Sequence, residues 1–332
     1  MPTPPTQFVE PDLGERVARA ILSYGGGVMS WRRVGGLACL ATLGFACAVS
    51  VSSNVHASAT AFGGVTRTFP YRQKKLLFSR QGPGALVHVP DGTADGATLP
   101  VLVFLHGQNT EQHLHPRFDG TSGDLRKIAN DLRLQGKTRP FLIAAPTHTR
   151  YATGSTVMWP TFEIGHFLDA TDAELGGRAK TDRTHVVVVG HSAAGCNATT
   201  GLFAAARLPA VRAVVSVDTC LTESIRDAYL ALAPKTDLRI FWNAAWPGPR
   251  PFADLASDCR NPSHPCRVTE VTNLSPTEGA PHDAILAEAL RRVLPELFPA
   301  SVMATPPKPA QSEPSLSEGS RPAREPVARD AR

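Results

Sequence analysis

The chain has 332 residues, 42% of them apolar and 19% charged, with a formal net charge of +5 at pH 7. The apolar content is ordinary for a globular protein. Arginines in the N-terminal segment and the C-terminal tail supply part of the basic excess, and no single dense stripe does, which argues against nucleic-acid binding.

The N-terminal segment predicts export. Arg32 and Arg33 precede an uncharged run over residues 34–51, and Ser52-Ser53-Asn54 and then Val55-His56-Ala57 follow. This order of positive, apolar and small residues is typical of a signal peptide, with cleavage after Ala57. The paired arginines also resemble a twin-arginine signal, so Sec and twin-arginine export both stay open, as does an uncleaved anchor. We expect a secreted or periplasmic protein without stable membrane insertion after cleavage.

Composition divides the chain into three regions. Residues 1–57 form an N-terminal extension and signal peptide, in which translation begins at either Met1 or Met29. Residues 58–300 have the length of a single catalytic domain of the α/β class. Residues 301–332 are dominated by Pro, Ser, Ala, Glu and Arg without apolar periodicity, which predicts a disordered tail.

Within residues 58–300, short apolar runs alternate with amphipathic segments. Apolar residues recur at helical spacing from Leu125 to Leu132 and from Leu286 to Leu297. Strands are expected over residues 84–89, 101–105, 141–145, 185–189, 211–217, 238–242 and 267–272. The alternation predicts crossover connections and a mostly parallel, doubly wound sheet flanked by helices.

The strongest local signal is a serine that follows a buried strand. Four consecutive valines are followed by Gly190-His191-Ser192-Ala193-Ala194, and then by small residues that are compatible with a helix. A nucleophile on such a strand-to-helix turn occupies a strained backbone conformation and needs small neighbours two residues away. The helix N-terminus would also stabilise developing negative charge. The pattern therefore predicts Ser192 as a nucleophile.

A second motif agrees with this reading. The expected strand over residues 101–105 ends in His106-Gly107-Gln108-Asn109. The order of elements from about residue 84 to 298 resembles the α/β-hydrolase superfamily, in which a His-Gly after the third strand shapes the oxyanion hole. The resemblance implies that the backbone amides of Gln108 and Ala193 hold the oxyanion.

The same resemblance implies a base and an acid further along the chain. His282 follows the last expected strand, where the order nucleophile, acid, base requires a histidine. Asp218 directly ends the strand over residues 211–217, whereas Asp254 and Asp258 lie in the commoner family position. A catalytic acid must be held rigidly, which favours Asp218 and leaves Asp254 as the alternative.

The cysteines predict disulfides. Two of the six lie in the signal segment, and an even number remains for an oxidising compartment. Adjacent parallel strands would bring Cys196 and Cys220 to one sheet edge, and Cys259 and Cys266 would then close a short loop. The alternative for Cys196 is a small buried thiol.

Further side chains are candidates for the substrate pocket or for a metal site. We expect His106, His191 and Trp159 to line the pocket. His113 and His115 are conceivable metal ligands, but no third ligand is apparent, so neither a metal nor a cofactor is expected.

These features together predict an exported serine hydrolase that cleaves carboxylic esters through an acyl-enzyme. The expected partner is a small-molecule or cell-envelope acyl substrate, with no nucleic acid. An extracytoplasmic amidase or peptidase with the same triad is one alternative. A catalytically idle binding protein with a hydrolase fold is another.

Overall fold

The computed structural model describes residues 62–71, 84–109, 115–147, 159–244, 252–275 and 279–300, and all of them belong to one compact unit. The predicted signal peptide and C-terminal tail lie outside these residues. Among the described helices, none combines the length and the apolar character that a membrane crossing requires.

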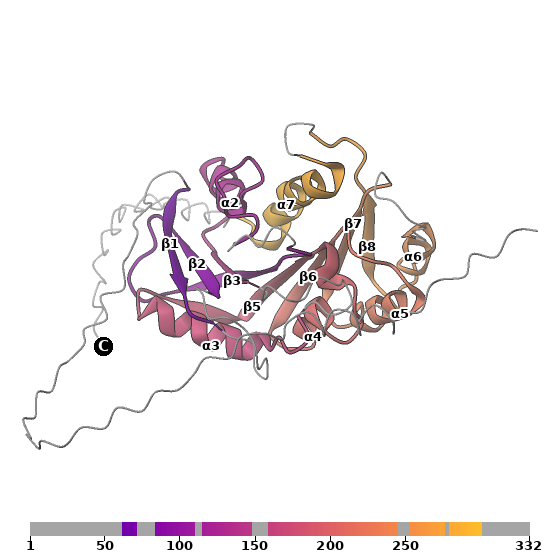
Figure 1. Cartoon of the computed structure of the whole chain (residues 1–332), viewed down its shortest axis with the longest axis horizontal. Coiled ribbons are helices and arrows are strands. Elements are labelled where there is room, and N and C mark those ends of the chain that lie inside the picture. Colours follow the sequence, from indigo (N-terminus) through magenta and orange to yellow (C-terminus); the bar gives the residue numbers. More distant parts are fainter. Residues whose placement is uncertain are drawn as a thin grey trace, which may run out of the picture. The chain divides into compact units, whose positions relative to one another are not determined.

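An eight-stranded sheet forms the centre of this unit (Figure 1). The strands follow the order β1-β2-β4-β3-β5-β6-β7-β8, in which β1, β2 and β4 pair antiparallel and all pairs from β4 to β8 are parallel. Their bounds are β1 Gly64–Phe69, β2 Ala85–Pro90, β3 Ala97–Leu105, β4 Leu142–Pro146, β5 Ala179–His191, β6 Val211–Val217, β7 Asp237–Trp242 and β8 Cys266–Glu270. The predicted mostly parallel sheet is confirmed.

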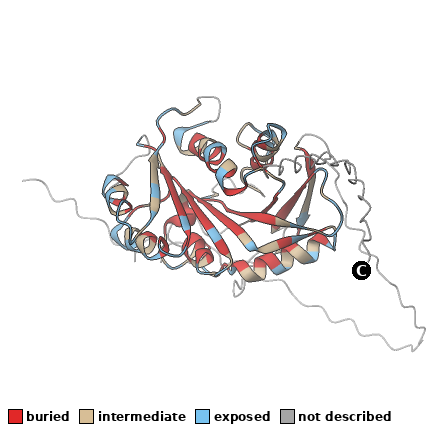
Figure 2. Ribbon diagram, turned by 180° about the vertical axis from the view of Figure 1, so that it is seen from behind, coloured by how far each residue is buried: buried red, intermediate tan, exposed pale blue. Residues whose placement is uncertain are grey.

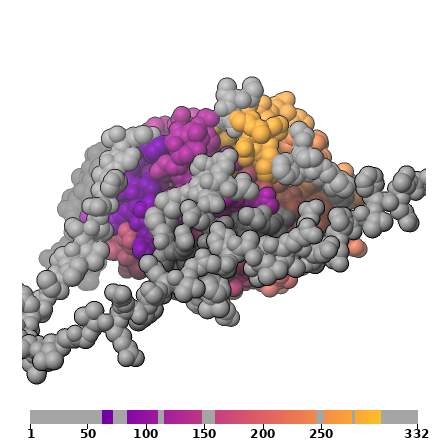
Figure 3. Space-filling view, viewed as in Figure 1, coloured from indigo at the N-terminus to yellow at the C-terminus, as the bar shows by residue number. Residues whose placement is uncertain are grey.

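Helices cover both faces of the sheet. The helices α2 and α7 lie together on one face, and α3, α4 and α5 lie on the other, with α6 beside the edge strand β8 (Figure 1). The space-filling view shows the residues of α2, in magenta, against those of α7, in yellow (Figure 3). The bounds are α2 Leu125–Leu134, α3 Ile164–Leu175, α4 Gly201–Ala206, α5 Glu223–Leu232, α6 Phe252–Asp258 and α7 Pro281–Leu297.

The four valines of β5 explain why this strand lies at the centre. Successive side chains of a strand point to opposite faces. Val186 and Val188 pack in the core under α3, α4 and α5, while Val187 and Val189 pack in the core under α2 and α7. A strand that is apolar on both faces is therefore buried on both sides, as the red strands of Figure 2 show.

The strands and the two helices predicted from the sequence are present, with bounds that differ by a few residues except for β5, which begins six residues earlier than expected. One expectation was wrong: the residues after Ser192 form no regular helix. A four-residue 3-10 helix, η2, spans Ser192–Gly195, and α4 begins only at Gly201. The glycines, Asn197 and the threonines of this segment are poor helix formers, which explains the interruption.

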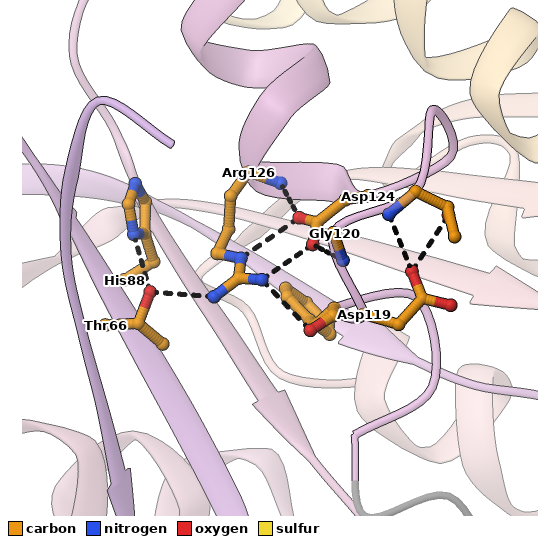
Figure 4. A network of polar contacts seen from close by, with 8 residues as sticks. Thr66, His88, Asp119, Gly120, Asp124 and Arg126 are labelled. Carbon is orange, nitrogen blue, oxygen red and sulfur yellow. Dashed lines mark hydrogen bonds and ion pairs between the residues drawn. The ribbon is translucent and has the colours of Figure 1, made fainter. Parts of the chain in front are cut away.

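A buried ion pair anchors the start of α2 (Figure 4). Arg126 is 7% exposed and donates to both carboxylate oxygens of Asp124, at 3.0 and 2.6 Å. It also donates to the Phe118 carbonyl and to Thr66 Oγ1, at 2.9 and 3.1 Å. The Thr66 hydroxyl oxygen accepts from Arg126 and also lies 3.0 Å from His88 Nδ1. Burial and the charge of Arg126 lower the pKa of His88 to about 4, so this imidazole is neutral at pH 7.

This network joins the edge of the sheet to the loop before α2. Asp124 is the N-cap of α2 and accepts from the backbone N–H groups of Arg126 and Gly120, both at 2.9 Å. Thr66 lies on β1, and Phe118 and Gly120 lie on the loop over residues 115–124. The Asp124 carboxylate, with hydrogen bonds to both of its oxygens, therefore stabilises the conformation of this loop. Arg117 and Asp119 of the same loop line the cavity described below.

Removing the cation of this pair should destabilise the fold. Arg126→Met keeps an apolar stem but leaves the carboxylate of Asp124 buried without its counter-ion, and we expect the free energy of unfolding to fall by about 3–5 kcal/mol. Urea denaturation measures the change. The matched control is Arg292→Met, which breaks an exposed pair with Glu288 and should cost less than about 0.5 kcal/mol. Equal effects of the two variants would contradict the role given to Arg126.

Candidate active site

The backbone of Ser192 is strained. Its φ of 54° lies in the left-handed region, which a residue with a side chain rarely adopts. The strand β5 ends one residue earlier, so the serine side chain stands at the carboxyl edge of the sheet. A Cβ on Gly190 would lie 3.0 Å from the Leu202 side chain of α4, so a larger residue there would require Leu202 to shift. This is the local geometry that the Gly-x-Ser pattern predicts for a nucleophile.

Gly107 lies directly against this serine. A Cβ on Gly107 would come within 2.5 Å of Ser192 Cβ and 3.0 Å of its Oγ, so only glycine fits. The contact follows from the register of the sheet, in which Leu105 of β3 pairs with Gly190 of β5. The segment after β3 and the turn after β5 therefore meet at one place on the sheet edge.

His106 and Trp159 stabilise the turn after β3. The His106 Nδ1 donates to the Gly107 carbonyl at 2.7 Å, and the Trp159 indole N–H donates to the His106 carbonyl at 3.0 Å. The two rings pack edge to face with centroids 4.9 Å apart. Trp159 was expected to line the substrate pocket, but it is fully buried beneath the turn and is not among the cavity residues. An aromatic residue in the sequence does not reveal whether its ring supports a pocket wall from behind or forms its surface.

The side chains of His282 and Asp218 are in direct contact. His282 Nδ1 lies 2.6 Å from Asp218 Oδ2, and the Asn243 backbone N–H donates to Asp218 Oδ1 at 3.3 Å. Asp218 is 1% exposed and has a φ of 48° directly after β6. A carboxylate accepts, so His282 carries a proton on Nδ1 and presents Nε2 as its basic nitrogen.

The alternative acids lie elsewhere. Asp254 is exposed on α6. Asp258, on the same helix, accepts from Arg226 Nε at 2.6 Å. Of the three aspartates weighed from the sequence, the structure brings only Asp218 into hydrogen-bond contact with His282.

A cavity of about 580 Å³ joins these groups. Its walls include Ser192, Asp218 and His282, together with His106, Gln108 and Ala193 from the two turns. Polar and charged residues form another part of the wall: Asn109, His115, Arg117, Asp119, His191 and Asp283. Arg117 and Asp283 form an ion pair between the loop before α2 and the first turn of α7. The residues proposed from the sequence for the triad and oxyanion hole therefore share one cavity.

Two histidines of the cavity wall are neutral at pH 7. Burial is the main cause that lowers the pKa of His115 to about 4, and the charge of Arg126 adds to it. His115 Nδ1 lies 2.9 Å from Thr147 Oγ1. Burial also lowers the pKa of His191 well below its usual value, with further contributions from the charges of Arg117 and His282. His113 lies outside the described residues, within which no group of three metal-ligating side chains occurs.

Both predicted cysteine pairs are disulfide-bonded in the structure. Cys196 directly follows η2 and Cys220 lies two residues after Asp218, so this bond connects the serine turn to the segment after the acid. Both of its cysteines line the cavity. The backbone N–H of Cys220 also donates to Cys196 Sγ at 3.3 Å. Cys259 and Cys266 close the short loop before β8.

This chain is similar to known proteins in its three-dimensional structure and has no match by sequence. No protein-family model and no curated protein matches the sequence. A ferulic acid esterase is similar in structure over 71% of this chain and 98% of its own, with 17% identity and a TM-score of 0.53. A feruloyl esterase module from Clostridium thermocellum covers 71% of this chain and 88% of its own, at 11% identity and a TM-score of 0.48. The first likeness shows that the chain has the α/β-hydrolase fold.

The disulfides can be tested by alkylation. The denatured protein, kept without reductant, should leave Cys196, Cys220, Cys259 and Cys266 unlabelled in a peptide map. The loss of chain entropy in the unfolded state corresponds to about 3.5 kcal/mol of stabilisation for the bond that spans 24 residues and about 2.4 kcal/mol for the one that spans 7. Replacing each pair by alanines and measuring urea unfolding checks this order. A labelled Cys196 would instead support the free buried thiol.

Proposed function

We propose that the chain is an exported serine hydrolase that cleaves carboxylic esters, with Ser192, His282 and Asp218 as its triad. The observation that carries the proposal is the 2.6 Å contact between His282 Nδ1 and Asp218 Oδ2, in the same cavity as a serine with a φ of 54°. A buried carboxylate fixes the tautomer of a histidine that shares a cavity with a partly exposed serine, which is the set of groups that covalent acyl transfer uses.

The reaction proceeds in two halves. His282 Nε2 takes the proton of Ser192 Oγ, which attacks the ester carbonyl carbon to form a tetrahedral oxyanion. His282 then protonates the leaving alkoxide, and the C–O bond to it breaks, which leaves an acyl-enzyme and an alcohol. Water, deprotonated by His282, attacks the acyl carbon, and Ser192 recovers its proton as the carboxylic acid leaves.

The oxyanion is stabilised by backbone amides in this proposal. Gln108 follows Gly107, which lies against Ser192, and Ala193 follows the serine itself, so both residues border the reacting atoms. Amide donors held by a rigid turn need no reorganisation when charge develops. The bonds from His106 and Trp159 provide that rigidity on the Gln108 side.

The choice of an ester over an amide rests on the structural likeness to the ferulic acid esterase. Export rests on the signal-like sequence and is supported by the two disulfides, which persist in oxidising compartments. The amidase or peptidase alternative uses the same residues and predicts faster turnover of amide substrates. The idle alternative predicts no turnover by a folded protein.

Ester hydrolysis by wild type and two aspartate variants tests the proposal. Asp218→Asn should lower kcat/KM for p-nitrophenyl acetate and methyl ferulate by about 10³–10⁴-fold, because the amide no longer fixes the His282 tautomer. Asp254→Asn, a substitution at an exposed position of α6, is the matched control and should change kcat/KM less than about twofold. A larger loss in Asp254→Asn than in Asp218→Asn would refute the assignment of the acid.

A further inference from the structure

One buried histidine of the cavity has no part in the proposed chemistry. His191 lies between Gly190 and Ser192 and is 4% exposed. Its pKa is well below the usual value, so the side chain is an uncharged imidazole that burial has deprived of water. A buried imidazole N–H normally has a hydrogen-bond acceptor, and the identity of that acceptor indicates the structural role of the ring.

The acceptor is the backbone of the proposed base. His191 Nε2 lies 2.8 Å from the carbonyl oxygen of His282, and the two rings are 4.7 Å apart and tilted by 31°. A carbonyl only accepts, so the proton of His191 is on Nε2. Asp218 holds the ring of His282, and His191 holds its main chain.

The helix α7 begins without a side-chain cap. His282 is the second residue of α7, and the N-cap of this helix, Ala280, has no side chain that caps it. The exposed N–H groups of a first helical turn normally gain such a partner. Tertiary contacts also hold this turn: Asp218 contacts the ring of His282, Arg117 pairs with Asp283, and His191 bonds the main-chain carbonyl of His282.

An equivalent bond joins the middle of β5 to the last turn of α7. His185 Nε2 lies 3.0 Å from the Leu297 carbonyl near the end of α7, and Arg139 donates to His185 Nδ1 at 3.1 Å. Strand β5 is thus fastened to α7 twice, each time by an imidazole N–H that donates to a helix carbonyl. Only the bond of His191 lies beside the proposed triad, so His185 is a matched control for it.

We propose that His191 is a positioning residue, which sets the distance between the nucleophile and the base by joining the turn of Ser192 to the backbone of His282. The inference rests on the proposed function for its effect on turnover. Its structural part, that the bond from His191 holds the first turn of α7, does not depend on any activity.

Three variants of the full protein separate positioning from packing. His191→Phe keeps a ring without the donor, and His191→Gln places an N–H near the original Nε2. His185→Phe removes the equivalent bond at the far end. We expect His191→Phe to lower kcat for ester hydrolysis by about 10–100-fold with KM within about twofold, since a small misplacement of a catalytic group has effects of this size. His191→Gln should recover most of the loss, and His185→Phe should leave kcat within about twofold.

Hydrogen–deuterium exchange provides a readout that needs no turnover. Peptides from the first turn of α7 should exchange faster in His191→Phe than in wild type, and those from its last turn should do so in His185→Phe. Unchanged exchange of the first turn in His191→Phe, or equal kcat in His191→Phe and His191→Gln, would overturn the proposal.

Absence of Ser192-dependent turnover in wild type would refute the proposed function, and exchange would still decide the role of His191. If His191→Phe does not fold, His191→Leu replaces it as the variant without a donor. Its first α7 turn should then exchange faster, and its kcat should be lower, than in His191→Gln.

Discussion

The burial of β5 on both faces is the constraint on which the candidate site depends. Its four valines fill the two cores on either side of the sheet, which fixes the strand in the middle between β3 and β6. Because these three strands are parallel neighbours, the segments that follow their carboxyl ends all begin at the same edge of the sheet. Gly107 after β3, Ser192 after β5 and Asp218 after β6 meet there for that reason, and α7 adds His282.

Two of the four described non-glycine residues with positive φ angles lie at that edge. Ser192 and Asp218 both have positive φ angles, a conformation that costs about 1–3 kcal/mol for a residue with a side chain. The surrounding bonds offset this cost: the Asp218 N–H donates to the Phe241 carbonyl at 2.8 Å, and the disulfide from Cys196 to Cys220 joins the two strained turns. Strain at the ends of two neighbouring central strands is what a pre-organised site requires, because rigid groups need little reorganisation during reaction.

Much of this edge could be predicted from the sequence because the signals are local. A continuous apolar run predicts a buried strand, and a glycine two residues before a serine predicts the turn. Contacts between distant segments carry no such signal: the bond from His191 to His282 spans 91 residues, and that from Arg126 to Thr66 spans 60. The choice between Asp218 and Asp254 also needed the folded chain, since it depends on how α6 lies after β7. A regular helix directly after Ser192 was wrongly expected, because the glycines, Asn197 and the threonines that follow the serine are poor helix formers.

The claim that Ser192 is an activated nucleophile is tested most directly by covalent labelling. The purified protein is treated with a fluorophosphonate, and its intact mass is compared with that of the Ser192→Ala variant treated in the same way. The account predicts one adduct per chain in wild type and none in the variant, with both proteins folded and fully disulfide-bonded. A folded wild type without an adduct, or an adduct that persists in Ser192→Ala, would contradict it.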